Sequence, residues 1–169
     1  MPVPDFQKRP APSSAPTPWR ALSAERRIEI VTQAVKRHRD LRAGLVQRLV
    51  ARGGGFRSVT LLSWPPERLA KEVVRLNAQA TQDELDLLHL LYVELEPAIQ
   101  ITFLDAAGVK HADGVIDESL EAPFCDEAAT RRAVAAVRSA HGAACEHYLT
   151  TILTYGADSW PGLASALER

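Results

Sequence analysis

The sequence contains few cysteines, few aromatic residues and no apolar run long enough to cross a membrane. Two of its 169 residues are cysteine and 6% are aromatic. If Cys125 and Cys145 lie on or beside one helix, the helical rise separates them by roughly 30 Å, which is far beyond disulfide reach. Unpaired thiols suit a reducing compartment. Because the N-terminus also lacks the apolar core of a signal peptide, we expect a soluble cytoplasmic protein without a membrane segment.

Hydrophobic residues make up 46% of the chain and charged residues 24%, as in an ordinary globular protein. Ala and Leu dominate the apolar set, which favours close helix packing over a sheet. The net charge of −1 is unevenly distributed, because residues 20–57 contain ten Lys or Arg against three Asp or Glu (net +7). Residues 58–127 contain four against fourteen (net −10). The two segments can pair within one chain or between chains, and the sequence leaves both open.

Proline is concentrated at the N-terminus, where residues 1–18 contain six of the eleven prolines. Proline interrupts helices, and the Ala, Ser and Thr residues between these prolines offer little apolar surface to bury. We therefore predict a disordered tail over residues 1–18. Residues 19–169 are expected to form a single all-α domain, a compact bundle of four to five main helices.

Apolar residues at helical spacing predict a first long helix from Ser23 to Arg52, which the three glycines at 53–55 bring to an end. A shorter helix follows, with Ser63 as its expected cap and Pro66 in its first turn.

The four residues Thr81–Glu84 match a capping box, the most specific local signal in the chain. The helix that they open is apolar on nearly every side from Leu85 to Leu95, which places it at the centre of the bundle. Pro97 should kink or break this helix near Val93, and a further helical segment should reach Gly108.

The pair Asp113-Gly114 predicts the turn of a small hairpin within residues 109–116. The last long helix is predicted from Asp126 to Tyr155. One titratable side chain, His141, interrupts the apolar stripe of this helix, so it is expected either to be hydrogen-bonded in the core or to belong to a site.

Five residues stand at spacings that resemble metal-ligand pairs, namely His141 with Cys145, Asp86 with His89, and His38. Helical bundles bind metals through such pairs on facing helices. The pattern is not specific, because no Glu-x-x-His or His-Glu-x-x-His motif accompanies it. We therefore expect no metal and no cofactor, and we expect the His141 ring to bond a carbonyl or a neighbouring side chain. A metal-dependent helical-bundle enzyme with a His/Cys-lined site remains the alternative.

Basic residues surround the first predicted helix wherever its apolar stripe does not: Arg26, Arg27, Lys36, Arg37, Arg39, Arg42, Arg48 and Arg52. Nucleic-acid sites gather such charges on one face and add stacking or base-reading residues, which are missing here. We expect no nucleic-acid partner. The leading hypothesis is a non-enzymatic helical module for protein–protein interaction or self-association, with a protein partner or a second copy of the chain.

Overall fold

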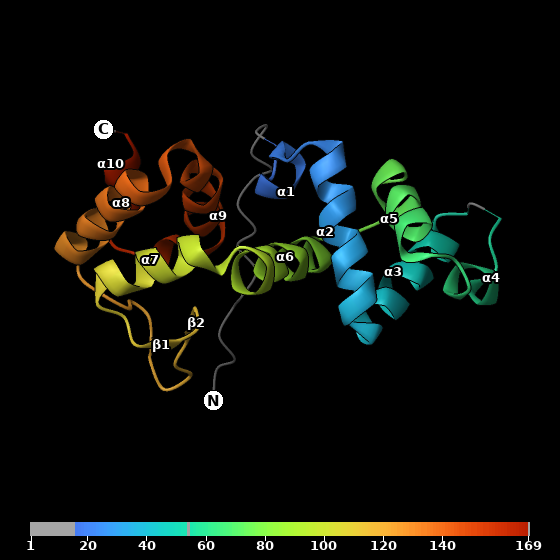
Figure 1. The fold of residues 1–169 in the computed structure, drawn as a ribbon, viewed down its shortest axis with the longest axis horizontal. Coiled ribbons are helices and arrows are strands. Elements are labelled where there is room, and N and C mark those ends of the chain that lie inside the picture. Colours follow the sequence, from blue (N-terminus) through green and yellow to red (C-terminus); the bar gives the residue numbers. More distant parts are fainter. Residues whose placement is uncertain (1–15, 54, 169) are drawn as a thin grey trace, which may run out of the picture.

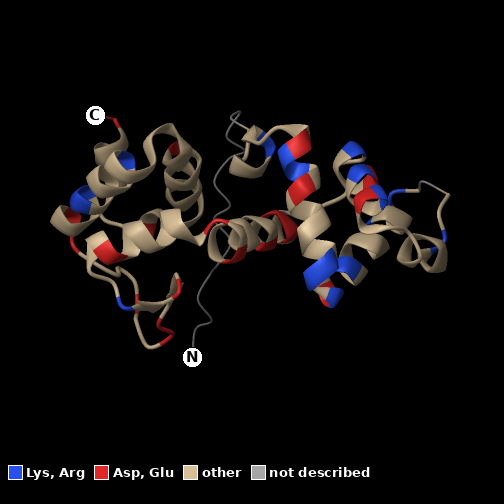
Figure 2. Ribbon diagram, viewed as in Figure 1, with Lys and Arg blue, Asp and Glu red and all other residues tan. Residues whose placement is uncertain are grey.

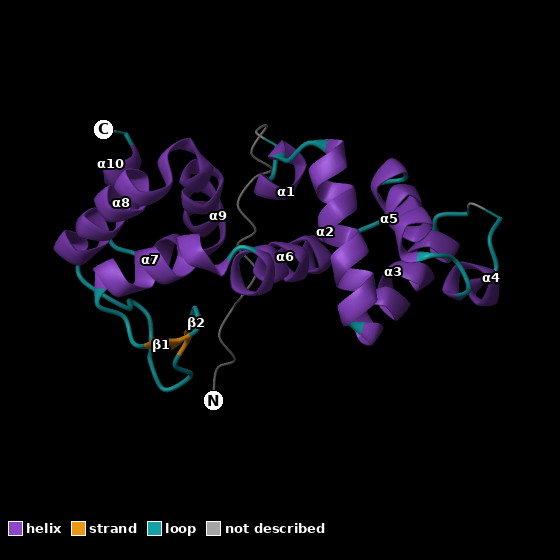
Figure 3. Ribbon diagram, in the orientation of Figure 1, coloured by secondary structure: helices purple, strands orange, loops and turns teal. Residues whose placement is uncertain are grey.

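The computed structural model describes residues 16–53 and 55–168, and Figure 3 shows that these residues are mostly helical. The predicted all-α fold is therefore confirmed, and residues 1–15 of the predicted tail lie outside the described residues. In chain order the elements are α1 (Pro18–Ala21), α2 (Ala24–Arg37), α3 (Arg39–Ala51), α4 (Ser58–Leu62), α5 (Pro66–Arg75), α6 (Thr81–Leu90), the π-helix η1 (Leu91–Leu95), α7 (Pro97–Ala107), β1 (His111–Ala112), β2 (Val115–Ile116), α8 (Glu127–His141), the 3₁₀-helix η2 (Gly142–Cys145), α9 (Glu146–Gly156), the 3₁₀-helix η3 (Ala157–Ser159) and α10 (Leu163–Leu167).

The helices form two groups that α6 connects (Figure 1). Helices α2 to α5 gather toward one end of the long axis, and α7 to α10 gather toward the other together with the hairpin. Buried apolar side chains from both groups belong to one contiguous cluster. Leu88 and Leu91 are each only 2% exposed, which confirms that the apolar helix lies at the centre of the core.

The ordered fold begins earlier than the predicted boundary at residue 18. The Thr17 side chain caps α1 by accepting a hydrogen bond from the Arg20 amide, and Pro18 is buried beside the fully buried Trp19. The Pro18 carbonyl accepts a hydrogen bond of 2.7 Å from Nε2 of His147. Residues 17 and 18, which the sequence assigns to the tail, are therefore fixed to the body of the protein.

The predicted first helix is divided in two at His38, whose backbone is extended (φ −118°, ψ 101°). Neither proline nor glycine marks this position, and the apolar spacing continues across it. At the break, the His38 Nε2 atom lies 3.0 Å from a carboxylate oxygen of Glu94. Division at this point lets both halves turn apolar side chains into the core, including Val35 of α2 and Leu45 of α3.

The start of the central helix is displaced by one residue from the predicted capping box. Ala80 is the N-cap, and its amide donates to the Asp83 carboxylate at 2.6 Å. Thr81 is the first residue of α6, so its hydroxyl does not cap the helix. The Asp83 carboxylate accepts the hydrogen bond of the Ala80 amide, so Glu84 does not cap the helix as the capping box predicts. Its side chain is buried instead (4% exposed).

Pro97 breaks the central helix as predicted. The last turn before it widens into η1, where the Glu96 amide donates to the Leu91 carbonyl five residues earlier. The axes before and after the break are bent by 84°. No single described helix is long and apolar enough to span a membrane, and only the bent pair at this break meets such a test, by length and composition alone.

The hairpin is confirmed, with His111 opposite Ile116 and a turn at Asp113-Gly114 in which both residues have positive φ. The predicted last helix is instead divided at Gly142. Gly142 adopts φ 54° and ψ −137°, a backbone region that side chains with a Cβ rarely occupy. The α-helix ends there and a 3₁₀-helix follows, so α8 and α9 do not form one continuous helix.

Candidate interaction surfaces and cavities

His141 and Cys145 do not form a site together, because the helix breaks between them. His141 is half-buried, and its Nε2 atom lies 3.0 Å from the Thr102 hydroxyl of α7. The expectation that this ring bonds a neighbouring side chain is confirmed. The buried Cys145 thiol instead donates to the Gly142 carbonyl at 3.1 Å, and burial raises its pKa. Cys125 and Cys145 are both free.

The other three residues of the predicted metal set line one cavity of about 430 Å³ between α6 and the α2–α3 break. His38, Asp86 and His89 contribute to this polar cavity together with Glu94 and Asp40. Within residues 16–53 and 55–168, however, no three His, Cys, Asp or Glu side chains are placed to hold a metal ion. The sequence therefore identified residues that share a cavity, but the geometry is not that of a metal centre.

A second cavity of about 450 Å³ lies on the other side of Asp86 and His89, between α6, α7 and α9. Unlike the polar cavity, this aromatic cavity is walled mainly by apolar side chains. Five aromatic residues take part: Tyr92, Phe124, Tyr148, Tyr155 and Trp160. Its volume and its mixture of aromatic walls with a few polar groups are typical of small-molecule sites.

Tyr92, which lines the aromatic cavity, belongs to a series of hydrogen bonds that the sequence does not predict. His147 bonds the Tyr92 hydroxyl through Nδ1 and the Pro18 carbonyl through Nε2. A carbonyl can only accept, so Nε2 carries the proton and a neutral ring accepts from Tyr92 through Nδ1. Burial raises the pKa of Tyr92, which keeps its hydroxyl available as the donor. No spacing rule links residues 18, 92 and 147, so no sequence pattern indicates this series of hydrogen bonds.

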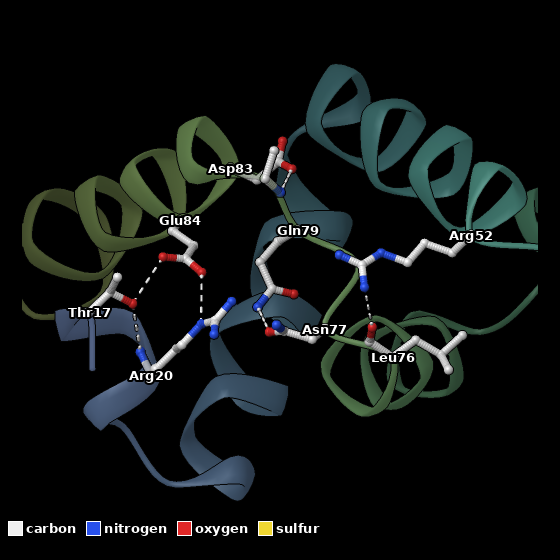
Figure 4. A network of polar contacts seen from close by, with 9 residues as sticks. Thr17, Arg20, Arg52, Leu76, Asn77, Gln79, Asp83 and Glu84 are labelled. Atoms are coloured by element: carbon white, nitrogen blue, oxygen red, sulfur yellow. Dashed lines mark hydrogen bonds and ion pairs between the residues drawn. The ribbon is translucent and has the colours of Figure 1, made fainter. Parts of the chain in front are cut away.

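Two buried carboxylates at the start of α6 connect it to neighbouring helices, and Figure 4 shows the Glu84 contacts and the capping bond of Asp83. Glu84 accepts from the Thr17 hydroxyl at 3.1 Å and lies 3.7 Å from the Arg20 guanidinium, so it holds α1. Asp83 accepts from Arg48 of α3 at 3.2 Å, in addition to its capping bond. A buried carboxylate needs such partners to offset the loss of its hydration.

The basic and acidic segments pair within the chain. Six ion pairs connect them among the described residues: Arg20–Glu84, Arg26–Glu96, Lys36–Glu67, Arg37–Glu94, His38–Glu94 (if the ring is protonated) and Arg48–Asp83. Much of the basic helix surface is therefore occupied by carboxylates of the same molecule. Pairing within one chain, one of the two arrangements that the sequence allows, is therefore present.

The exposed large apolar side chains lie in two places of opposite charge. One set, the basic end, contains Val50, Val59 and Leu62 of α3 and α4 with the exposed arginines Arg52, Arg57 and Arg68. The other set, the acidic end, contains Val115 and Leu120 with the exposed carboxylates Asp113, Glu118 and Glu121. Figures 1 and 2 show these sets toward opposite ends of the long axis.

Comparisons of the chain with protein-family models, with curated protein sequences and with solved structures found no match.

Proposed function

We propose that this protein is a non-enzymatic helical module that self-associates head to tail, with the basic end of one copy bound to the acidic end of the next. The observation that carries this proposal is the pairing of exposed apolar side chains with opposite charges at the two ends. Val59 is 78% exposed on a helix whose neighbouring Leu61 is fully buried, so α4 turns apolar surface both inward and outward. Exposed apolar surface bordered by charge is typical of interaction sites.

A second copy is the partner that the charges favour. The exposed arginines of the basic end and the exposed carboxylates of the acidic end complement each other, which steers encounter and fixes orientation. Because the two contacting surfaces differ, the interface is heterologous, and a dimer leaves one basic end and one acidic end free. The residues of the metal-dependent alternative are separated in the fold, since His141 and Cys145 lie outside the polar cavity that the other three residues line.

The strength of the contact follows from what each end can bury. A fully buried Val or Leu contributes about 1.5–3 kcal/mol, and these side chains are already partly covered. Association costs several kcal/mol in lost rigid-body freedom, so only a modest surplus remains. We therefore expect weak association that rises with protein concentration and weakens as salt screens the exposed charges.

Sedimentation velocity on two charge-reversed variants tests this arrangement. Arg57→Glu with Val59→Ser disables the basic end, and Glu118→Lys with Leu120→Ser disables the acidic end. Each variant alone should sediment as a monomer under conditions in which the natural chain associates. Mixed in equal amounts, they should form a dimer and nothing larger, because one intact basic end then meets one intact acidic end.

Arg39→Glu is the matched control, since Arg39 is exposed but belongs to neither end. It should associate like the natural chain. Association of the natural chain should also weaken between about 0.05 M and about 0.5 M salt. A natural chain that stays monomeric at every concentration would refute self-association. Oligomers that persist in both variants, or a mixture that stays monomeric, would refute the head-to-tail contact.

A further inference from the structure

The aromatic cavity has the composition of a ligand site that self-association does not use. Its walls come from α6, α7, α9, the hairpin and the segment around Trp160, so elements distant in sequence close around one space. Tyr92 and Tyr148 pack edge to face at 5.0 Å, and Phe124 lies 5.3 Å from Trp160 between ring centroids. These contacts fix the rings in position before any ligand arrives.

The charge of the aromatic cavity has one sign. Asp86 contributes a carboxylate to its lining, and neither Lys nor Arg is among the described residues that line it. Among the described residues, the Asp86 carboxylate accepts one side-chain hydrogen bond, at 2.9 Å from the Gln82 amide, and takes part in no ion pair. A carboxylate without a cation, beside rings whose faces are electron-rich, attracts positive charge.

We propose that the aromatic cavity binds a small organic cation, an ammonium group attached to an aromatic body. The body occupies the space between the rings, and the ammonium group pairs with Asp86 at the cavity's polar side. This inference is independent of self-association, because Asp86 belongs to neither the basic nor the acidic end.

Three indole compounds of similar size test the choice of charge: tryptamine as the ammonium compound, tryptophol as its neutral alcohol analogue and indole-3-propionate as the anion. Titration calorimetry should give the tightest binding for tryptamine. Because Asp86 is exposed, we expect a preference of roughly two- to fivefold over tryptophol, the range that exposed ion pairs support. The propionate should bind weakest.

Indole N–H signals in ¹H–¹⁵N NMR spectra locate the bound compound. Tryptamine should shift the signal of Trp160, which lines the cavity, and leave that of Trp64, which does not line it. Asp86→Asn should remove the preference for tryptamine over tryptophol and keep the Trp160 shift. Asp40→Asn is the control, because Asp40 lines only the polar cavity.

Several outcomes would overturn the proposal. Absence of binding by all three compounds would refute the site, and a shift at Trp64 instead of Trp160 would place the ligand elsewhere. Equal affinity for tryptophol and tryptamine, or a tryptamine preference that survives Asp86→Asn, would refute the role of the carboxylate. Loss of the tryptamine preference in Asp40→Asn would show that the charge preference arises in the polar cavity instead of the aromatic cavity.

Discussion

Replacement of Trp19 tests whether the segment after the proline-rich region is part of the core. Trp19 is fully buried, and a buried tryptophan removes about 200 Å² from water. At about 25 cal/mol per Å² this area corresponds to about 5 kcal/mol, and truncations of buried Trp to Ala cost about 3–5 kcal/mol. We therefore expect Trp19→Ala to lose about 3–5 kcal/mol of unfolding free energy. In a protein of this size that lowers Tm by roughly 6–20 °C.

Trp19→Phe separates the apolar contribution from the polar one. The Trp19 indole N–H is buried without a hydrogen-bond partner in the described residues, so the phenyl ring removes an unsatisfied donor along with some apolar area. This variant should lose less than half as much stability as Trp19→Ala. Urea unfolding followed by far-ultraviolet circular dichroism measures both changes without relying on tryptophan fluorescence. A loss below about 1 kcal/mol for Trp19→Ala would show that α1 does not pack as described.

Three further predictions concern the core and its buried tyrosines. Leu88→Ala should cost about 2–5 kcal/mol in urea unfolding, because it opens a cavity beside the aromatic residues. A double-mutant cycle with Tyr92→Phe and His147→Phe should give a coupling of about 0.5–3 kcal/mol, and additive losses would contradict their hydrogen bond. Burial raises the pKa values of Tyr92 and Tyr148 above the ordinary value near 10, so the unfolded chain releases phenolic protons first. Stability should therefore fall as pH rises above about 10, and absorbance at alkaline pH should show these two phenols ionising late or only on unfolding.

The parts of the fold predicted from sequence are those fixed by local chemistry. Pro97 lacks an amide proton, so it cannot donate the hydrogen bond that would continue the helix. The turn at Asp113-Gly114 needs positive φ, which Gly accepts freely and Asp tolerates better than most residues. Asp126, where the sequence predicts the last long helix to begin, caps α8 by accepting a hydrogen bond of 2.7 Å from the Ala129 amide.

The parts that were missed depend on contacts between distant segments. The α2–α3 break at His38 lies beside Glu94, a residue 56 positions later, and the apolar spacing is the same on both sides. Gly142 did offer a local signal, since glycine within a helical pattern lowers helix stability. A glycine is also tolerated in a continuous helix, so the signal alone does not fix a reversal.

The cavities were predictable only in part. Asp86 and His89 share a helix face by their spacing, and both line the two cavities. The rings that complete the aromatic cavity come from residues 92 to 160, and the bends at Pro97 and Gly142 bring them together. Sequence spacing therefore predicts which side chains share a face of α6. The ligand-sized cavity depends on how several helices are oriented relative to one another, which spacing does not predict.

The π-turn at Leu91–Leu95 also makes the protein sensitive to the length of the chain at one point. A hydrogen bond that spans five residues holds one more residue than an α-helical turn does. Removal of a residue from this turn could leave a regular helix, but it would rotate the following residues by about 100° relative to those before the turn. Tyr92 and Pro97 would then no longer be in phase. We therefore expect this turn to tolerate substitution by side chains of similar size more readily than deletion of a residue.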